Sequence, residues 1–209
     1  MTVTAVEEYT KGRYKIFLND EFAFVLYKGE LHKTGIALSA ELDESRIEEI
    51  NESIVCKRAK LRAMNLLKSR DYTERALRRK LKDGLYTDEI IEKAVSYVKS
   101  YGYIDDCRYA QNYIRSNIKQ RSRKEIHMKL LEKGLSPETI DYAFEEECGM
   151  DADEGEEELM KRLLMKKCRN TDASDPAGRK KILAYMYTKG FSTDKTERLL
   201  DEVLLDITS

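Results

Sequence analysis

The sequence predicts a mainly α-helical protein, in which tandem three-helix repeats form an elongated, curved array behind a small N-terminal β-hairpin extension. Charged residues make up 37% of the 209 residues, and there are only two prolines, a composition typical of solvent-exposed helices. After residue 53, one pattern of apolar residues followed by a glycine occurs three times. Such a spacing, of roughly fifty residues, is typical of helical repeat proteins.

Residues 1–52 are expected to form the extension. Residues 13–18 and 22–26 read as strands and flank Asn19 and Asp20, which favour a tight turn. Two strands alone are marginally stable, so residues 3–6 or the following helix are expected to pack against them. The apolar face of the hairpin is expected to consist of Tyr14, Ile16, Leu18, Phe22, Phe24 and Leu26.

The helix that follows the hairpin is expected to begin at Ser39 as its N-cap and to run to Ile50. From residue 53 onward, residues 73–85, 122–135 and 176–191 align on their glycines. Apolar residues one and two turns before each glycine mark one helical face. Each glycine is expected to take the left-handed conformation that ends a helix, with the next residue packing back on it; the pairs are Gly84 and Leu85, Gly134 and Leu135, and Gly190 and Phe191.

Each turn is followed by an N-cap residue, and each helix pair is preceded by a further amphipathic helix. The N-caps are Thr87, Ser136 and Ser192, and the preceding helices are expected at 54–69, 105–119 and about 156–169. The chain is therefore divided into repeats at residues 53–103, 104–150 and 151–209. Each repeat is too small to bury its apolar stripes alone, so the repeats are expected to stack on one another.

The net charge of −1 conceals a strong segregation of charge. Residues 55–135 carry 21 basic and 10 acidic residues, a net charge of +11, whereas residues 1–54 and 136–209 carry −5 and −7. A basic segment of this density attracts a polyanion. The functional surface is therefore expected within residues 55–135.

The helix after Thr73 presents four cations on one side, and only Glu74 and Asp83 interrupt this face at its ends. The cations are Arg75, Arg78, Arg79 and Lys82, spaced at i, i+3, i+4 and i+7. We interpret them as a binding face for DNA or an acidic protein surface, although a solvated helix face is the alternative. The patch is extended by Arg108, Arg115, Lys119, Arg121, Arg123 and Lys124.

Asp105 and Asp106 have two interpretations. Adjacent carboxylates suit a metal ion or acid-base chemistry. The favoured interpretation is architectural, because Asp105 lies where an N-cap is expected, Asp106 suits the helix dipole, and Tyr103 and Ile104 are placed to pack there. Tyrosines of this region suit base stacking or, more simply, core packing.

The run at residues 101–110, which places Gly, an aromatic, an aliphatic and two Asp residues before Tyr109 and Ala110, resembles the signature of the RecX family. Residues 69–81 resemble its first-repeat motif, in which Arg and a hydroxyl residue precede a Leu-rich basic helix; Tyr72 departs from many relatives. The run 133–135 with Ile140 resembles the end of its second repeat. Residues 12–16 and 22–24 resemble the β extension of some members. The signature residues are Tyr103, Asp105, Asp106, Tyr109 and Ala110.

The resemblance implies a regulator that binds RecA and RecA filaments on single-stranded DNA and modulates their stability, ATPase, strand exchange and SOS-related activities. Many members inhibit RecA. The family has no catalytic residues to carry over, so we expect no enzyme, no cofactor and no metal. A sequence-nonspecific DNA-binding helical protein is the alternative, favoured by the basic segment.

Other features restrict the class of protein. The four cysteines form no CxxC pair, and no run of eighteen apolar residues occurs. We therefore expect a soluble, monomeric protein of the cytoplasm with no membrane partner. The acidic run at residues 145–158 resembles a calcium loop only in part, and we interpret it as a flexible or frayed join between the second and third repeats.

Overall fold

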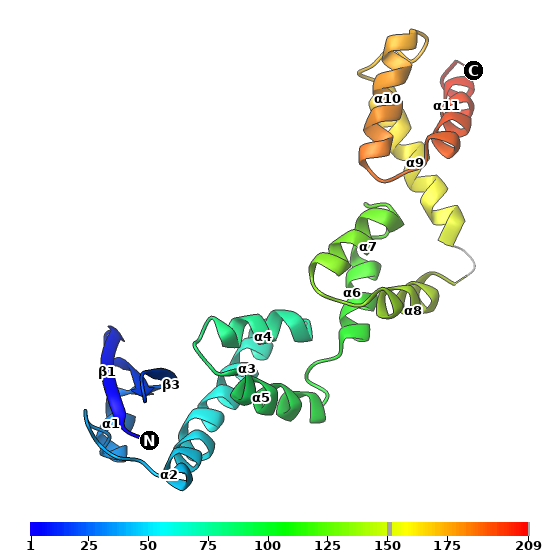
Figure 1. Ribbon diagram of the computed structural model, residues 1–209. Helices are drawn as coiled ribbons and strands as arrows, with labels where there is room; N and C mark the ends of the chain where they lie inside the picture. The colour runs from blue at the N-terminus through cyan, green and yellow to red at the C-terminus, as the bar shows by residue number, and fades with distance from the viewer. Residues whose placement is uncertain (150–151, 209) are drawn as a thin grey trace. The chain divides into compact units, whose positions relative to one another are not determined.

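The computed structural model describes residues 1–149 and 152–208, and they form two compact units, Met1–Asp105 and Asp106–Ser209 (Figure 1). Most of the described residues are helical, and the strands belong to one small N-terminal sheet. The predicted mainly α-helical class, with three-helix domains behind a β extension, is confirmed. The curved arrangement of the repeats stays a prediction.

The first unit joins a three-stranded antiparallel sheet to a bundle of helices. The order of the strands is β1-β2-β3. One apolar core runs through this unit, from Ile16 and Phe24 of the sheet to Leu77 and Leu81 of the bundle. The elements are β1 (Val3–Thr10), β2 (Arg13–Leu18), β3 (Glu21–Tyr27), α1 (Lys28–Thr34), α2 (Glu44–Ile50), η1 (Asn51–Cys56), α3 (Lys57–Ser69), α4 (Glu74–Lys82) and α5 (Asp88–Ser100).

The predicted hairpin is present, and residues 3–6 belong to the third strand that it needed. Asn19 and Asp20 both have positive φ, as a two-residue hairpin turn requires. The expectation for Phe22 is wrong, because the register of β2 and β3 shifts between Ile16 and Phe17. Phe22 thus pairs with Phe17 and is 38% exposed, while the rest of the expected face is buried or half-buried.

The segment between sheet and bundle differs from the prediction. Ser39 is not an N-cap; its φ is +65°, and its N–H donates to the carbonyl of Val3. The helix begins instead at Glu44, where Asp43 Oδ1 accepts a hydrogen bond from the Arg46 N–H at 2.7 Å. The π-helical turn η1 then joins α2 to α3 without a break, so residues 52 and 53 lie inside one continuous helical segment. This segment packs against both the sheet and the bundle.

The second unit consists of helices that surround two apolar clusters. One cluster includes Ile114, Ile126 and Leu130, and the other includes Met160 and Leu199. The helices are α6 (Asp106–Asn117), α7 (Arg123–Glu132), α8 (Pro137–Cys148), α9 (Ala152–Cys168), α10 (Pro176–Thr188) and α11 (Thr193–Thr208). Most of the acidic run is helical, in α8 and α9, but Met150 and Asp151 at its centre lie outside the described residues.

The glycine turns follow the prediction in two repeats and depart from it in the first. Gly134 and Gly190 have φ of +91°, and the next residue, Leu135 or Phe191, is buried. In the first repeat the residue with positive φ is Leu85. Tyr86 then donates its N–H to the Leu81 carbonyl, as Leu135 does to Leu130, so the alignment of Gly84 with Gly134 is wrong by one residue.

Candidate functional site

The predicted cationic face lies on α4 in the first unit. Thr73 caps this helix, and its Oγ1 accepts a hydrogen bond from the Ala76 N–H at 3.1 Å. Leu77 and Leu81 are completely buried, which fixes the opposite side of the helix against the core. As a result Arg75, Arg79 and Lys82 are exposed, and Arg78 is half-buried.

Carboxylates of α5 approach this face. Arg78 NH2 lies 2.9 Å from Glu74 and 2.8 Å from Glu92, and Lys82 Nζ lies 2.5 Å from Asp88. The expectation that only Glu74 and Asp83 interrupt the face is therefore wrong, because α5 folds back beside α4 and adds two carboxylates. Arg78 and Lys82 connect two helices of the bundle.

Glu74 is the centre of this ionic network. It accepts hydrogen bonds from Lys99 Nζ at 2.8 Å and from Arg78 Nε at 2.9 Å. The hydrogen bond from Lys99 holds the pKa of Glu74 below its ordinary value of 4.5, and Arg78 lowers this pKa further, while partial burial opposes both. The Arg78 guanidinium also lowers the pKa of Glu92.

We expect Glu74→Gln to lower the free energy of unfolding by about 1 kcal/mol near pH 7, because glutamine loses the charge that Lys99 and Arg78 contact. The folded pKa of Glu74 lies below 4.5, so its contribution is complete above that pH and is lost as the pH falls through the folded value. Urea unfolding at about pH 7 and about pH 3 should show the difference from wild type shrinking in acid. A difference that is the same at both pH values would contradict this assignment.

Arg75 and Arg79 remain as the two exposed guanidiniums of the face. Neither forms an ion pair with any residue within 1–149 or 152–208. They lie four residues apart on α4, so both side chains leave the same side of the helix. Of the predicted face, these two side chains are the best placed to meet a partner.

The six candidates that follow residue 105 lie in the second unit, where several have intramolecular contacts. Arg115 binds both carboxylate oxygens of Glu147, at 2.9 and 2.6 Å, and Arg121 lies 3.0 Å from Glu125. The guanidinium of Arg123 lies 4.8 Å from the centre of the Phe144 ring. Lys119 and Arg108 are exposed.

Arg123 and Lys124 stand where the helices of the second repeat meet those of the third. The Arg123 N–H donates to Glu156 of α9 at 3.2 Å, and Lys124 Nζ lies 6.0 Å from the Tyr187 ring of α10. Nearby, Ser122 Oγ donates to the Lys189 carbonyl at 2.6 Å. These residues therefore contribute to packing within the second unit, in addition to any contact with a partner.

The signature residues lie at the junction of the two units along the chain. Ala110 is completely buried and Tyr109 is half-buried on α6, which begins at Asp106. Tyr103 does not pack as expected: its side chain is 54% exposed and stacks on Tyr101, with 6.0 Å between ring centres. The role of Asp105 as an N-cap stays a prediction.

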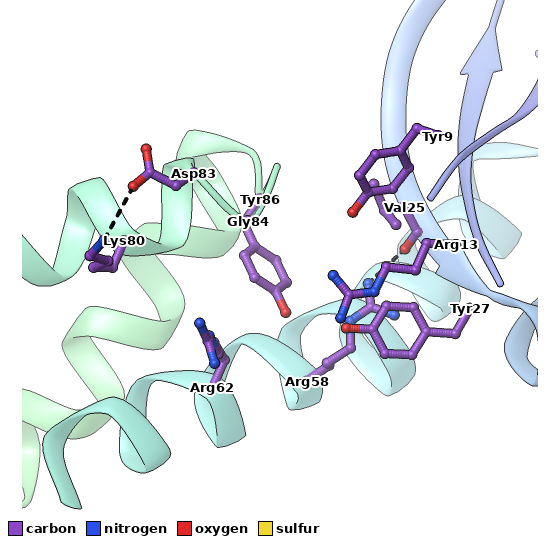
Figure 2. A pocket seen from close by; sticks show the side chains of 10 residues that line it. All are labelled: Tyr9, Arg13, Val25, Tyr27, Arg58, Arg62, Lys80, Asp83, Gly84 and Tyr86. Carbon is purple, nitrogen blue, oxygen red and sulfur yellow. Dashed lines mark hydrogen bonds and ion pairs between the residues drawn. The ribbon is translucent and has the colours of Figure 1, made fainter. Parts of the chain in front are cut away.

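The first unit also contains a basic, tyrosine-lined pocket that was not predicted from the sequence. It has a volume of about 280 Å³ and lies where the sheet meets α3 and the turn after α4 (Figure 2). Its polar side chains come from separate elements: Tyr9 of β1, Arg13 of β2, Tyr27 of β3, Arg58 and Arg62 of α3, Lys80 of α4, and Asp83 and Tyr86 beyond it. The spacing of Arg58 and Arg62, one helical turn apart, is the only local sign of this pocket.

Arg58 anchors this region. It forms an ion pair with Glu30, and its NH2 group donates to the Val25 carbonyl at 2.6 Å. Its guanidinium carbon lies 4.3 Å from the centre of the Tyr27 ring and 5.8 Å from that of Tyr86. One largely enclosed side chain, 15% exposed, thus connects α3, the sheet and the turn of the first repeat.

Among the described residues, no three His, Cys, Asp or Glu side chains gather as metal ligands, and no helix is long and apolar enough to cross a membrane. Two candidate binding sites in the described structure are the Arg75 and Arg79 pair and the basic pocket of the first unit.

Comparison with known proteins gives consistent matches. Residues 59–97 match the family model for the first three-helix domain of RecX, and residues 105–143 match that for the second. Regulatory protein RecX of Leuconostoc mesenteroides is 30% identical and covers 93% of this chain, which spans 73% of that relative. The RecX of Clostridium beijerinckii is 27% identical over 98% of this chain and 95% of its own. A crystal structure of regulatory protein RecX aligns with a TM-score of 0.65 and 28% identity, over 96% of this chain and 98% of the other.

Proposed function

Since the chain belongs to the RecX family of regulatory proteins, we propose that it binds RecA and RecA filaments on single-stranded DNA and inhibits their ATP hydrolysis and recombination. It acts as a non-enzymatic monomer in the cytoplasm, and through RecA it limits the SOS response. The observation that supports a specific binding surface is the state of Arg75 and Arg79. Both are exposed and form no ion pair with the described residues. Exposed arginines suit acidic protein surfaces and phosphates alike.

The first test is RecA's DNA-stimulated ATP hydrolysis in the presence of the purified chain at substoichiometric to equimolar amounts. The wild-type chain should lower the rate, and no effect over this range would refute the proposal. Reversing both charges in Arg75→Glu, Arg79→Glu should raise the half-inhibitory concentration about tenfold, equivalent to about 1.4 kcal/mol of binding free energy. Arg78 is left unchanged because reversing it would break its contacts with Glu74 and Glu92.

The matched control is Lys28→Glu, Lys33→Glu, which reverses two exposed charges on α1 in the same unit. This control changes the net charge by the same amount and should inhibit RecA as the wild type does. Equal weakening by both variants would mean that overall charge, and not the α4 face, governs the interaction.

Direct, sequence-nonspecific DNA binding is the second candidate, supported by the net charge of +11 on residues 55–135. It predicts DNA affinity that falls steeply with salt and falls in the Arg75 and Arg79 variant in parallel with the loss of RecA inhibition. Unchanged DNA affinity together with weaker RecA inhibition would eliminate this candidate and favour contact with RecA itself.

A further inference from the structure

The lining of the pocket in the first unit carries four cations, from Arg13, Arg58, Arg62 and Lys80, and one carboxylate, that of Asp83. Arg13 and Arg62 are exposed and form no ion pair with the described part of the chain. The Val25 carbonyl already accepts from Arg58, and the Asp83 carboxylate lies 3.8 Å from Lys80. A ligand of this pocket must therefore supply acceptors, which is the property of an oxyanion.

The donors converge. Figure 2 shows the hydroxyls of Tyr27 and Tyr86 pointing toward the space that the Arg13 guanidinium enters, with Arg62 across the pocket from Tyr9. The Arg13 guanidinium lies 5.0 Å from the centre of the Tyr27 ring, so the ring helps to hold the charged group in place before a ligand arrives. Burial raises the pKa of Tyr86, so its phenol keeps the proton that it donates.

We propose that this pocket binds a nucleotide, with the phosphate held by Arg13, Arg62 and the tyrosine hydroxyls and the base in the remaining volume. Guanidinium groups bind phosphate oxygens through paired hydrogen bonds. About 280 Å³ is more than a phosphate alone requires and leaves room for part of a sugar and base. Aromatic rings and guanidinium planes are the surfaces on which bases stack, and Tyr9 and Arg62 supply one of each.

The nucleotide has two possible sources, a free nucleoside phosphate or one unit of a single strand, and both present the same phosphate and base. The inference does not rest on the proposed action on RecA. Its test contains no RecA, so its failure is distinct from failure of the ATPase experiment.

The experiment is calorimetric titration of the full chain with thymidine monophosphate, thymidine, a short oligothymidylate and oligoglutamate. Thymidine monophosphate or the oligothymidylate should bind, and thymidine, which lacks the phosphate, should bind at least about tenfold more weakly. Equal affinity per site for the monophosphate and the strand identifies a free nucleotide as a sufficient ligand. Binding of the strand alone identifies a nucleotide within a strand; either result supports the proposal.

The variant Arg13→Gln, Arg62→Gln should weaken nucleotide binding about tenfold or more, because it removes two charged donors from exposed positions. Arg62→Gln alone, which disrupts no ion pair among the described residues, should weaken it about threefold and guards against misfolding of the double variant. Lys33→Gln removes a charge from α1, outside the pocket, and should leave the affinity unchanged.

Three results would overturn the proposal. These are absence of binding by both the monophosphate and the strand, equal binding by wild type and the Arg13 and Arg62 variants, and tighter binding of oligoglutamate than of either nucleotide. The last result would assign the pocket to an acidic peptide instead.

Discussion

Replacing Arg58 by methionine should lower the free energy of unfolding of the first unit by about 2–3 kcal/mol. Methionine retains the unbranched stem of the side chain but removes the guanidinium, and with it the ion pair with Glu30 and the hydrogen bond to the Val25 carbonyl. The Arg58 and Glu30 side chains are only 15% and 24% exposed, so the remaining carboxylate would stay partly buried without its cation. Residual solvent access keeps the expected loss below that of a completely buried pair.

The measurement is urea unfolding followed by circular dichroism, together with hydrogen exchange of the β2 and β3 amides. Exchange localises the effect, because Arg58 connects α3 to the sheet. The matched control is Arg62→Met, one turn further along α3 at an exposed position, which should change stability by less than about 0.5 kcal/mol.

A double variant separates the ion pair from simple packing. In Glu30→Gln, Arg58→Met the partly buried charge is gone, and glutamine still offers an oxygen to the Tyr27 N–H, which donates to Glu30 at 2.8 Å. The double variant should recover at least half of the loss caused by Arg58→Met. Equal stability of Arg58→Met and Arg62→Met would mean that the anchor contributes nothing.

Local sequence patterns predicted most of the helices, the N-caps Thr87 and Ser136 and the turn at Asn19 and Asp20, because each depends on neighbouring residues. Two of the errors arose where one extra residue changed a register. The irregularity between Ile16 and Phe17 turns Phe22 to the other face of the sheet, and no residue type there marks it. Similarly, a glycine at position 84 suggested the left-handed turn that Leu85 makes.

The misplaced turn of the first repeat has a functional consequence. Because Leu85 has positive φ, Tyr86 occupies the position that Leu135 and Phe191 hold in the other repeats. In all three repeats the side chain at this position belongs to an apolar core, but only Tyr86 of the three carries a hydroxyl, and it also lines the pocket. Aligning the repeats on their glycines placed Leu85 at this position, so the contribution of Tyr86 to the pocket could not be predicted.

The candidate site was only partly accessible from sequence, since its properties depend on tertiary neighbours. The spacing of the α4 cations is visible in the sequence. Their partners Glu92 and Asp88, however, lie on α5, the next helix along the chain. The pocket combines β1, β2, β3, α3 and the end of α4, segments separated by up to 77 positions between Tyr9 and Tyr86. No periodic pattern connects residues brought together by packing alone.

Replacing Gly178 by alanine should cost the second unit about 3 kcal/mol of stability. Gly178 is buried near the start of α10, where its N–H donates to Asp175 Oδ2 at 3.1 Å. A Cβ atom added there would lie 1.7 Å from the backbone carbonyl oxygen of Asp172, and the backbone of one segment would have to move. Chemical unfolding of the full chain, followed by the circular dichroism of its helices, measures the loss.

Gly155→Ala is the matched control with the opposite expected sign. Gly155 lies inside α9 of the same unit, and an added Cβ would meet nothing within 4 Å. Alanine there should stabilise the unit by up to about 1 kcal/mol, because it restricts the unfolded chain and favours the helix. The same chemical change should thus lower stability at Gly178 and raise it at Gly155. Stabilisation by both substitutions would show that α10 does not approach Asp172 closely in solution.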